Sequence, residues 1–324
     1  MPRATSPPTG ITHHALRPIL IAGPTAVGKS AVALALAERA NGEILSVDSM
    51  QVYRGLDVGA AKPSEQERRR VPHHLIDVVE VTEPFDAAQF IRLARSTMED
   101  IQSRGRIPIL CGGTGLYFKA LLEGLGEAPP SDPALRAELE ATALPELLRE
   151  LERRDPILFA KIDRQNPRRV IRALEVIRLS GAPFSAQRAA WAPQSRNAEL
   201  FFCLTRSSDD LRNRIEARVD RMFARGLVRE TERMLERGLA QNKTAMQAIG
   251  YRQVVEHLRG ERSLEDTIAL VKRRTRQLAK RQRTWFRHQL SWNWVDVEPD
   301  EEPSRGAERL IARIGKAAAA TSAI

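Results

Sequence analysis

Residues 23–30 constrain this chain more than any other stretch, because they fit the phosphate-loop pattern G-x-x-x-x-G-K-[ST]. Apolar residues 18–22 precede the loop and predict a short buried strand, and alanine- and leucine-rich residues 31–40 follow it and predict a helix. A strand, a glycine loop and a helix N-terminus form a ready anion site, since free N–H groups and the helix dipole point at the ligand. The matching residues are Gly23, Pro24, Thr25, Ala26, Val27, Gly28, Lys29 and Ser30.

The chemistry of this loop predicts a bound polyphosphate or pyrophosphate, and the loop alone does not say which. Lys29 supplies a cation, and the Ser30 hydroxyl is a suitable ligand for Mg²⁺. The alternative is an ordinary loop that matches eight residues by chance. The strand and helix patterns on either side favour the phosphate site.

The first part of the chain alternates strand and helix patterns. Strands are expected at residues 43–47 and 107–111, with a weaker one at 74–78. An amphipathic helix is expected at residues 86–104, and another helix follows the glycines at 112–115. This alternation predicts an α/β fold, with a P-loop NTPase-like parallel sheet flanked by helices.

A helical segment interrupts the alternation. A Gly- and Pro-rich linker at 124–132 leads into residues 133–188, which read as helix throughout, and a proline-containing stretch at 191–197 closes the segment. Strands at 199–205 and 292–295 and helices at 211–237, broken at Gly226, and 264–288 follow. We therefore expect a disordered leader at 1–17, a core made of 18–127 and 198–324, and a small helical insertion domain at 128–197.

Charge points to a polyanionic partner. The net charge is +10, and residues 272–287 contain eight Lys or Arg and no acid, so the rest of the chain carries only +2. Lys272, Arg276 and Lys280 lie at helical spacing in this segment, together with Arg283 and Arg287, and glutamines and aromatics are interleaved. Such a stripe suits phosphates and splayed bases, although a solvated charged helix is the alternative.

A second basic cluster lies at residues 168–172 of the insertion. On a helix, Arg168 and Arg172 are neighbours, as are Arg169 and Arg172, while Val170 packs inward. The remaining bulk features are unremarkable. Cys111 and Cys203 sit in apolar runs and are expected to be buried thiols, and no run is apolar enough to span a membrane, so a cytoplasmic location is expected.

Two further segments should reach the crevice beside the phosphate loop, because ligands of open α/β sheets bind outside the carboxyl ends of the strands. Asp48 follows one apolar strand and is a candidate proton acceptor; a helix cap or turn aspartate is the alternative. Thr114 follows another strand through Gly112 and Gly113 and offers a hydroxyl, or else an N-cap. A glycine stands where an ATPase usually has a metal-binding aspartate, which weakens an ATP hydrolysis reading.

The ordered set of motifs resembles the tRNA dimethylallyltransferases of bacterial type. The resemblance rests on residues 23–30, 47–55, 61–63, 72–77, 112–117, 166–175, 247–252 and 276–285, and it covers roughly residues 18–297. Ala60 departs from it, since the family often has threonine there. No C-terminal zinc-finger pattern like that of the eukaryotic members is present.

The resemblance implies transfer of a dimethylallyl group from dimethylallyl diphosphate to N6 of the adenine next to the anticodon, position 37, in tRNAs that read codons beginning with U. The phosphate loop would hold the donor's diphosphate, with Mg²⁺ on Ser30 or Thr25. Asp48, Thr114 and Lys29 would be catalytic. The anticodon stem-loop would be the partner of a monomeric enzyme.

The resemblance also implies a tRNA-binding set. It comprises Asp48, Ser49, Met50, Gln51, Thr114, Arg136, Arg168, Arg169, Val170, Ile171, Arg172, Gln247, Ala248, Ile249, Gly250, Tyr251, Arg252, Lys280, Arg281, Arg283 and Arg287. Two rival functions remain at this point. A P-loop nucleoside or small-molecule kinase would share the loop and Asp48, and a nucleotide-gated RNA-binding protein would bind without catalysis.

Overall fold

The computed structural model describes residues 16–125, 128–187 and 200–321. The chain divides into two compact units, one formed by Met1–Leu121 with Ser195–Ile324 and the other by Leu122–Gln194. The second unit therefore begins a few residues before the position expected for the insertion. The proline-containing stretch at 191–197 and the expected leader, apart from Leu16 and Arg17, lie outside the described residues.

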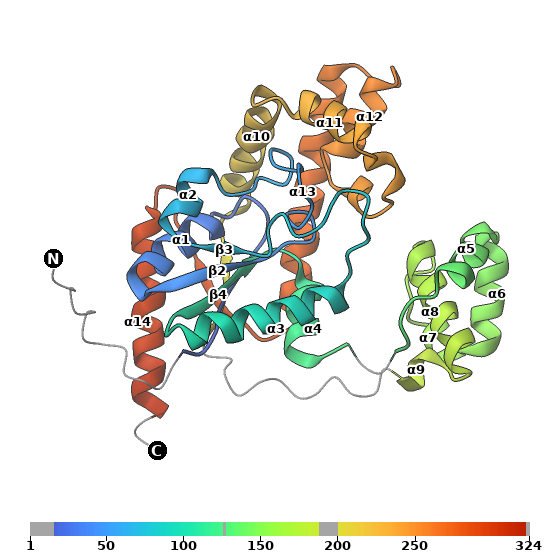
Figure 1. Ribbon diagram of the computed structural model, residues 1–324, viewed down its shortest axis with the longest axis horizontal. Helices are drawn as coiled ribbons and strands as arrows, with labels where there is room; N and C mark the ends of the chain where they lie inside the picture. The colour runs from blue at the N-terminus through green and yellow to red at the C-terminus, as the bar shows by residue number, and fades with distance from the viewer. Residues whose placement is uncertain (1–15, 126–127, 188–199, 322–324) are drawn as a thin grey trace. The chain divides into compact units, whose positions relative to one another are not determined.

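The first unit is built on a six-stranded parallel sheet with the order β3-β2-β4-β1-β5-β6 (Figure 1). The α/β expectation is thus confirmed, and the strands that precede the phosphate loop, Asp48 and Thr114 are neighbours in the sheet. The strands are β1 (Ile19–Ala22), β2 (Gly42–Val47), β3 (His73–His74), β4 (Ile107–Gly112), β5 (Phe201–Thr205) and β6 (Asn293–Asp296).

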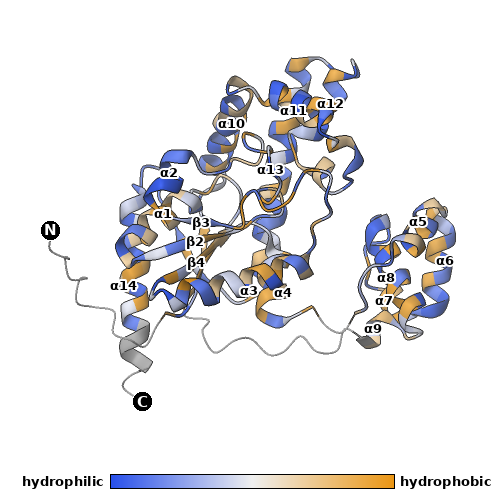
Figure 2. Ribbon diagram, viewed as in Figure 1, coloured by the Kyte–Doolittle hydropathy of each residue, from blue (hydrophilic) through white to orange (hydrophobic). Residues whose placement is uncertain are grey.

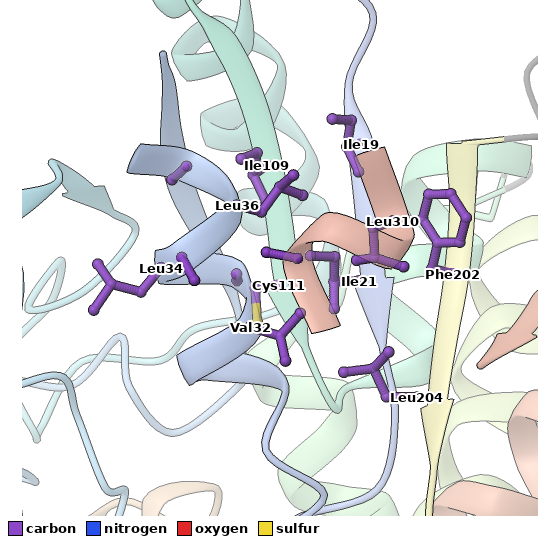
Figure 3. Close-up of a cluster of buried hydrophobic side chains, with 14 of the residues drawn as sticks. Ile19, Ile21, Val32, Leu34, Leu36, Ile109, Cys111, Phe202, Leu204 and Leu310 are labelled. Carbon is purple, nitrogen blue, oxygen red and sulfur yellow. The ribbon is translucent and has the colours of Figure 1, made fainter. Parts of the chain in front are cut away.

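Apolar side chains cover both faces of the sheet. On one face, α1 (Lys29–Ala40) packs with α14 (Pro303–Thr321), and residues of both helices, of β1 and of β4 form one core (Figure 3). Side chains alternate along a strand. Phe202 therefore joins this core, whereas Phe201 contacts Trp292 in an aromatic cluster with Phe118 and Phe286.

The remaining helices of this unit lie in two groups. Two follow the sheet strands, α3 (Ala87–Ser103), which Asp86 caps, and α4 (Gly115–Glu123). The second group contains α10 (Ser208–Ala224), α11 (Leu227–Glu236), α12 (Tyr251–Leu258) and α13 (Leu264–Gln289), with α10 packed on α13. The short α2 (Glu65–Arg70) is hydrophilic along its length (Figure 2) and buries no side chain.

The second unit is wholly helical in its described part. It contains α5 (Pro133–Ala141), α6 (Leu144–Arg154), α7 (Pro156–Phe159), α8 (Pro167–Ser180) and α9 (Phe184–Gln187). The central helix α8 buries Val170, Leu174 and Ile177 against leucines of α5, α6 and α7. Buried Asp155 caps α7 and also binds Ser185, which ties α7 to α9.

Most elements confirm the sequence predictions, including the break before Gly226 in the long helix. The strand predicted at 74–78 is wrong. The observed edge strand comprises only His73 and His74, and the positive φ angles of Leu75 (60°) and Asp77 (57°) end it. Cys111 and Cys203 are free buried thiols, as expected. No helix in the described part of the chain is long and apolar enough to cross a membrane.

Candidate active site

Three segments meet at the carboxyl edge of the sheet. The phosphate loop follows β1, Asp48 follows β2 and Thr114 follows β4, and these strands are adjacent, with Val47 beside Gly112 and Gly112 beside Ala22. Gly112 is required at this junction, because a Cβ atom there would lie 2.0 Å from the Val47 carbonyl oxygen. The sequence prediction that these segments end at one edge of the sheet is therefore confirmed.

Asp48 and Thr114 lie at adjacent strand ends and are linked through the main chain. The Ser49 N–H donates to Thr114 Oγ1 (3.1 Å), and the Met50 N–H donates to Asp48 Oδ1 (2.8 Å). Asp48 thus forms a local turn, and its carboxylate also interacts electrostatically with Lys29 and Arg218. The turn occupies one carboxylate oxygen.

The phosphate loop has the backbone that its glycines predict. Gly23 and Gly28 have φ angles of 150° and 102°, and a Cβ atom on Gly23 would lie 2.8 Å from the Leu204 carbonyl oxygen. Arginine side chains hold the loop from outside. Arg206 Nε donates to the Val27 oxygen (2.8 Å), and Arg214 Nε donates to the Ala26 oxygen (3.0 Å). These contacts come from residues nearly two hundred positions away.

A cavity of about 550 Å³ opens beside the loop. Its walls are the loop itself, Glu67 of α2 and one face of α10, which supplies Arg214, Arg218 and Arg221. With Lys29, four cations line the cavity, so its chemistry favours a multiply charged anion. The sequence analysis missed these arginines, although their spacing of four and three residues on a predicted helix was a usable signal.

Burial lowers the pKa of three of these cations, Lys29, Arg214 and Arg218, and Asp48 acts on two of them. Loss of hydration lowers the pKa of the Lys29 ammonium and that of the Arg218 guanidinium, while Asp48 acts on both in the opposite direction. A bound anion would favour the charged forms further. The cavity is therefore arranged so that anion binding compensates the cost of burying positive charge.

The hydroxyl groups fit a metal ion only in combination with a bound anion. Ser30 is exposed and lines the cavity, but the described residues contain no group of three or more His, Cys, Asp or Glu that could hold a metal ion. Mg²⁺ usually takes most of its ligands from phosphate oxygens and water. The donor set thus suits Mg²⁺ carried with a diphosphate.

The loop at residues 57–63 is fixed by buried polar groups. Gln51 donates to the carbonyl oxygens of residues 60 and 61, and buried Lys62 binds Asp57 and Asp77. Glu230 of α11 accepts from the N–H groups of residues 58 and 59 and from Tyr251 Oη. Burial and the Glu230 charge raise the pKa of Tyr251, so the phenol stays a donor.

The contacts of Tyr251 explain part of the motif at residues 247–252. Tyr251 and Ala248 are buried, so their side chains support the loop and the helix rather than offering a surface for RNA, which corrects the expectation for these two residues. Gln247 and Arg252 are exposed. Gly250 is buried and Ile249 is half-buried.

The residues of the cluster at 168–172 likewise differ in their exposure to solvent. Arg168 and Arg169 are exposed on α8. Val170 and Ile171 are buried in the helical core, so they are unsuited to RNA contact, contrary to the expectation. Arg172 donates to Glu175 (2.7 Å) and to the Pro129 oxygen (2.7 Å), which makes it a structural residue of this unit. Arg136 is close to Glu140 and Glu175.

The basic stripe of α13 does not simply face outward. Lys272 and Arg276 pair with Asp220 and Glu216 of α10, each at 2.7 Å, because α10 packs along this side of α13. Arg283 also reaches α10, where it donates to Ser208 Oγ. The expectation of one solvent-facing stripe is therefore wrong.

Other basic residues of α13 are more open. Arg287 stacks over the Trp294 ring and remains exposed. Lys280 and Arg281 are exposed and line a shallow cavity of about 500 Å³ with Trp285. These three members of the predicted tRNA-binding set remain exposed on this helix, as do Arg273 and Arg274.

The chain is similar to known proteins of one family. The sequence profile of the IPP transferase family matches residues 51–289. The chain is 46% identical over 284 residues to tRNA dimethylallyltransferase 1 of Trichlorobacter lovleyi, with 86% of this chain and 93% of that protein covered. It is 47% identical over 285 residues to the tRNA dimethylallyltransferase of Geobacter metallireducens, covering 86% and 92%.

Solved structures give the same relationship. The full-length tRNA isopentenylpyrophosphate transferase of Bacillus halodurans superposes with a TM-score of 0.68 at 39% identity, covering 93% of this chain and 97% of the other. A eukaryotic dimethylallyltransferase acting on tRNA gives 0.71 at 30% identity, covering 86% and 74%. The family profile, the relatives and the shared fold leave one conclusion: this chain belongs to the tRNA dimethylallyltransferase (IPP transferase) family.

Proposed function

We propose that the protein transfers the dimethylallyl group of dimethylallyl diphosphate to N6 of adenine 37 in the anticodon loop of tRNAs that read codons beginning with U. The observation that carries this proposal is the pairing of a four-cation cavity at the phosphate loop with Asp48 at the same edge of the sheet, where β4 lies between the strand of Asp48 and that of the loop. The products are the N6-dimethylallyl adenosine and diphosphate. The enzyme acts as a monomer in the cytoplasm, and one chain supplies all the groups invoked here.

The donor's diphosphate occupies the loop of residues 23–30 and the adjoining cavity. Breaking the allylic carbon–oxygen bond places negative charge on the departing diphosphate, and the loop N–H groups, Lys29 and the α10 arginines stabilise that charge. Ser30 or Thr25 would hold a Mg²⁺ ion that accompanies the diphosphate. When bound, the ion supplies further neutralisation of the leaving group.

The acceptor is a weak nucleophile that must leave the base stack. Asp48 accepts the proton that N6 loses, through the carboxylate oxygen that the turn leaves open. Thr114, fixed by the Ser49 N–H, positions the adenine or the donor next to this carboxylate. Ser49, Met50 and Gln51 line the approach to Asp48.

Phosphates of the anticodon stem-loop are bound by exposed cations. In the helical unit these are Arg168 and Arg169, with half-buried Arg136 as a weaker contributor. In the other unit they are Lys280, Arg281 and Arg287 of α13 and Arg252 of α12, with half-buried Arg283 as a further contributor. Gln247 and half-buried Ile249 complete the surface near α12.

One assay distinguishes this function from its rivals. The protein is incubated with labelled dimethylallyl diphosphate and unmodified tRNA, with Mg²⁺ and without ATP. Transfer of label to RNA is expected, and digestion should locate it on adenine 37. A kinase would give no transfer in this assay and would show activity only in a separate reaction with ATP and a small-molecule acceptor, and a non-catalytic RNA-binding protein would leave the donor intact.

The helical unit offers a separate test of RNA binding. Arg168→Ala and Arg169→Ala should each weaken tRNA binding, and each should lower the slope of log K against log salt by about 1, because one phosphate contact is lost. Arg39→Ala is a matched control, since this exposed arginine lies at the C-terminal end of α1, away from the crevice. A salt slope equal to that of the unaltered protein would remove both residues from the phosphate contacts.

A further inference from the structure

Gln282 of α13 connects two loops of the candidate active site. Its Oε1 accepts from the Thr25 N–H (2.8 Å), and its Nε2 donates to the Gly113 oxygen (2.9 Å). A main-chain N–H can only donate and a carbonyl oxygen can only accept, so the two partners fix the orientation of the amide. One side chain therefore joins the phosphate loop after β1 to the Thr114 loop after β4.

The neighbouring contacts show that this face of α13 is fitted to the loop. A Cβ atom on Gly113 would lie 2.5 Å from Gln282 Nε2, and one on Gly115 would lie 2.2 Å from the Trp285 ring. One turn further on, Gln289 accepts from Lys119 of α4. Residues 282, 285 and 289 form one helical face, so α13 packs closely against both sides of Thr114.

We propose that Gln282 is a positioning residue for the transfer reaction, which sets the distance between the donor's diphosphate and the groups that handle the acceptor. This inference rests on the proposed function. Thr114 Oγ1 accepts a hydrogen bond from the N–H of Ser49, the residue next to Asp48. Hydrogen bonds therefore link the phosphate loop to Gln282, Gln282 to the loop of Gly113 and Thr114, and Thr114 to the residue beside the proton acceptor. A shift of about 1 Å in such a distance costs roughly 100-fold in rate.

The hydrogen bond between Thr25 and Gln282 also limits which N–H groups of the phosphate loop can bind the diphosphate. The Thr25 N–H is donated to Gln282 and is not available to the diphosphate. The anion is then held by the later part of the loop, next to Lys29 and the start of α1. Because Gln282 lies between exposed Lys280 and Arg281 on one side and Arg283 on the other, the helix that meets RNA phosphates also supports the donor loop.

The test compares Gln282→Leu with Gln282→Glu and with the control Gln102→Leu. Gln102 donates one hydrogen bond to the Leu16 oxygen on the distant helix α3, so its replacement makes the same chemical change away from the site. Gln282→Leu should lower single-turnover transfer by about 10- to 100-fold and weaken binding of inorganic pyrophosphate in calorimetry, with tRNA affinity unchanged. Gln102→Leu should match the unaltered protein in all three measurements.

The pH dependence of the transfer rate of Gln282→Glu distinguishes a positioning role from a merely structural one. A protonated carboxyl can accept from Thr25 and donate to Gly113 as the amide does, whereas a carboxylate repels both the Gly113 oxygen and the diphosphate. The rate of this variant, divided by that of the unaltered protein at each pH, should therefore rise as the pH falls from 8 to 6, and the same ratio for Gln282→Leu should stay flat.

Three results would overturn the proposal: unchanged transfer and pyrophosphate binding in Gln282→Leu, a flat ratio for Gln282→Glu, or a loss confined to tRNA affinity. Thermal unfolding of each variant shows whether a loss reflects folding, and the pH ratio of a folded Gln282→Glu still decides the question. If the unaltered protein transferred no label to tRNA, the proposed function would fail, whereas the pyrophosphate comparison would still test the role of Gln282 in the loop.

Discussion

Replacing Asp48 with asparagine is expected to lower the rate of dimethylallyl transfer by about 100- to 10,000-fold, the range typical for loss of a general base. Asparagine keeps the oxygen that accepts from the Met50 N–H, so the turn after β2 should persist. It cannot accept a proton, and it removes the negative charge that interacts with Lys29 and Arg218. The loss should therefore appear in the chemical step and not in tRNA affinity.

Single-turnover transfer with saturating donor measures that step, and filter binding measures tRNA affinity. Asp48→Ala, which also breaks the turn, should be at least as slow. Asp100→Asn is the matched control, because Asp100 is exposed on α3 and pairs only with Arg104 among its described contacts. Undiminished transfer in Asp48→Asn would remove the proton-acceptor role and leave Asp48 as a turn residue.

The sequence predicts the phosphate loop and the neighbouring strand ends well, because each depends on a simple local pattern. A loop of eight residues between a strand and a helix carries its own geometry, and consecutive strand ends in a parallel sheet fall on one edge. For the same reason, Asp48 and Thr114 could be identified before their positions were known. Their hydrogen bond through Ser49 confirms the inferred proximity.

The features that the sequence does not predict depend on contacts between distant segments. Lys272 and Arg276 belong to a basic run, but α10 lies against them and supplies acids, so they stabilise helix packing. Arg172 looks equivalent to Arg169 on a helical wheel, but it donates a hydrogen bond to buried Glu175. In the sequence, Gln282 is one polar residue among cations, and only the fold shows that it binds Thr25 and Gly113.

Replacing Lys29 with methionine is expected to reduce the kcat/KM for dimethylallyl diphosphate by about 100- to 1,000-fold, as when one preorganised donor to a developing negative charge is lost. Methionine is similar in length and removes only the ammonium. Arg214, Arg218 and Arg221 remain in the cavity, so some affinity for pyrophosphate should persist. A change in transfer much larger than the change in pyrophosphate binding would assign Lys29 mainly to the transition state.

The pH dependence of pyrophosphate binding gives an independent test. Burial lowers the pKa of Lys29 in the free protein, and a bound anion raises it, so binding is accompanied by proton uptake between the two values. The contribution of Lys29 to affinity is complete below its free-state pKa and is lost as the pH rises through the bound-state pKa. Calorimetry in buffers of different ionisation enthalpy measures the uptake.

Pyrophosphate itself titrates, and the Lys29→Met variant corrects for this because it binds the same ligand without the ammonium. The affinity ratio of the unaltered protein to Lys29→Met should fall toward unity as the pH becomes alkaline. Lys29→Arg keeps a charge whose pKa lies much higher, so its ratio to Lys29→Met should stay flat across the same range. Parallel pH profiles for all three proteins would show that Lys29 is charged throughout, and that the burial of its ammonium has no bearing on anion binding.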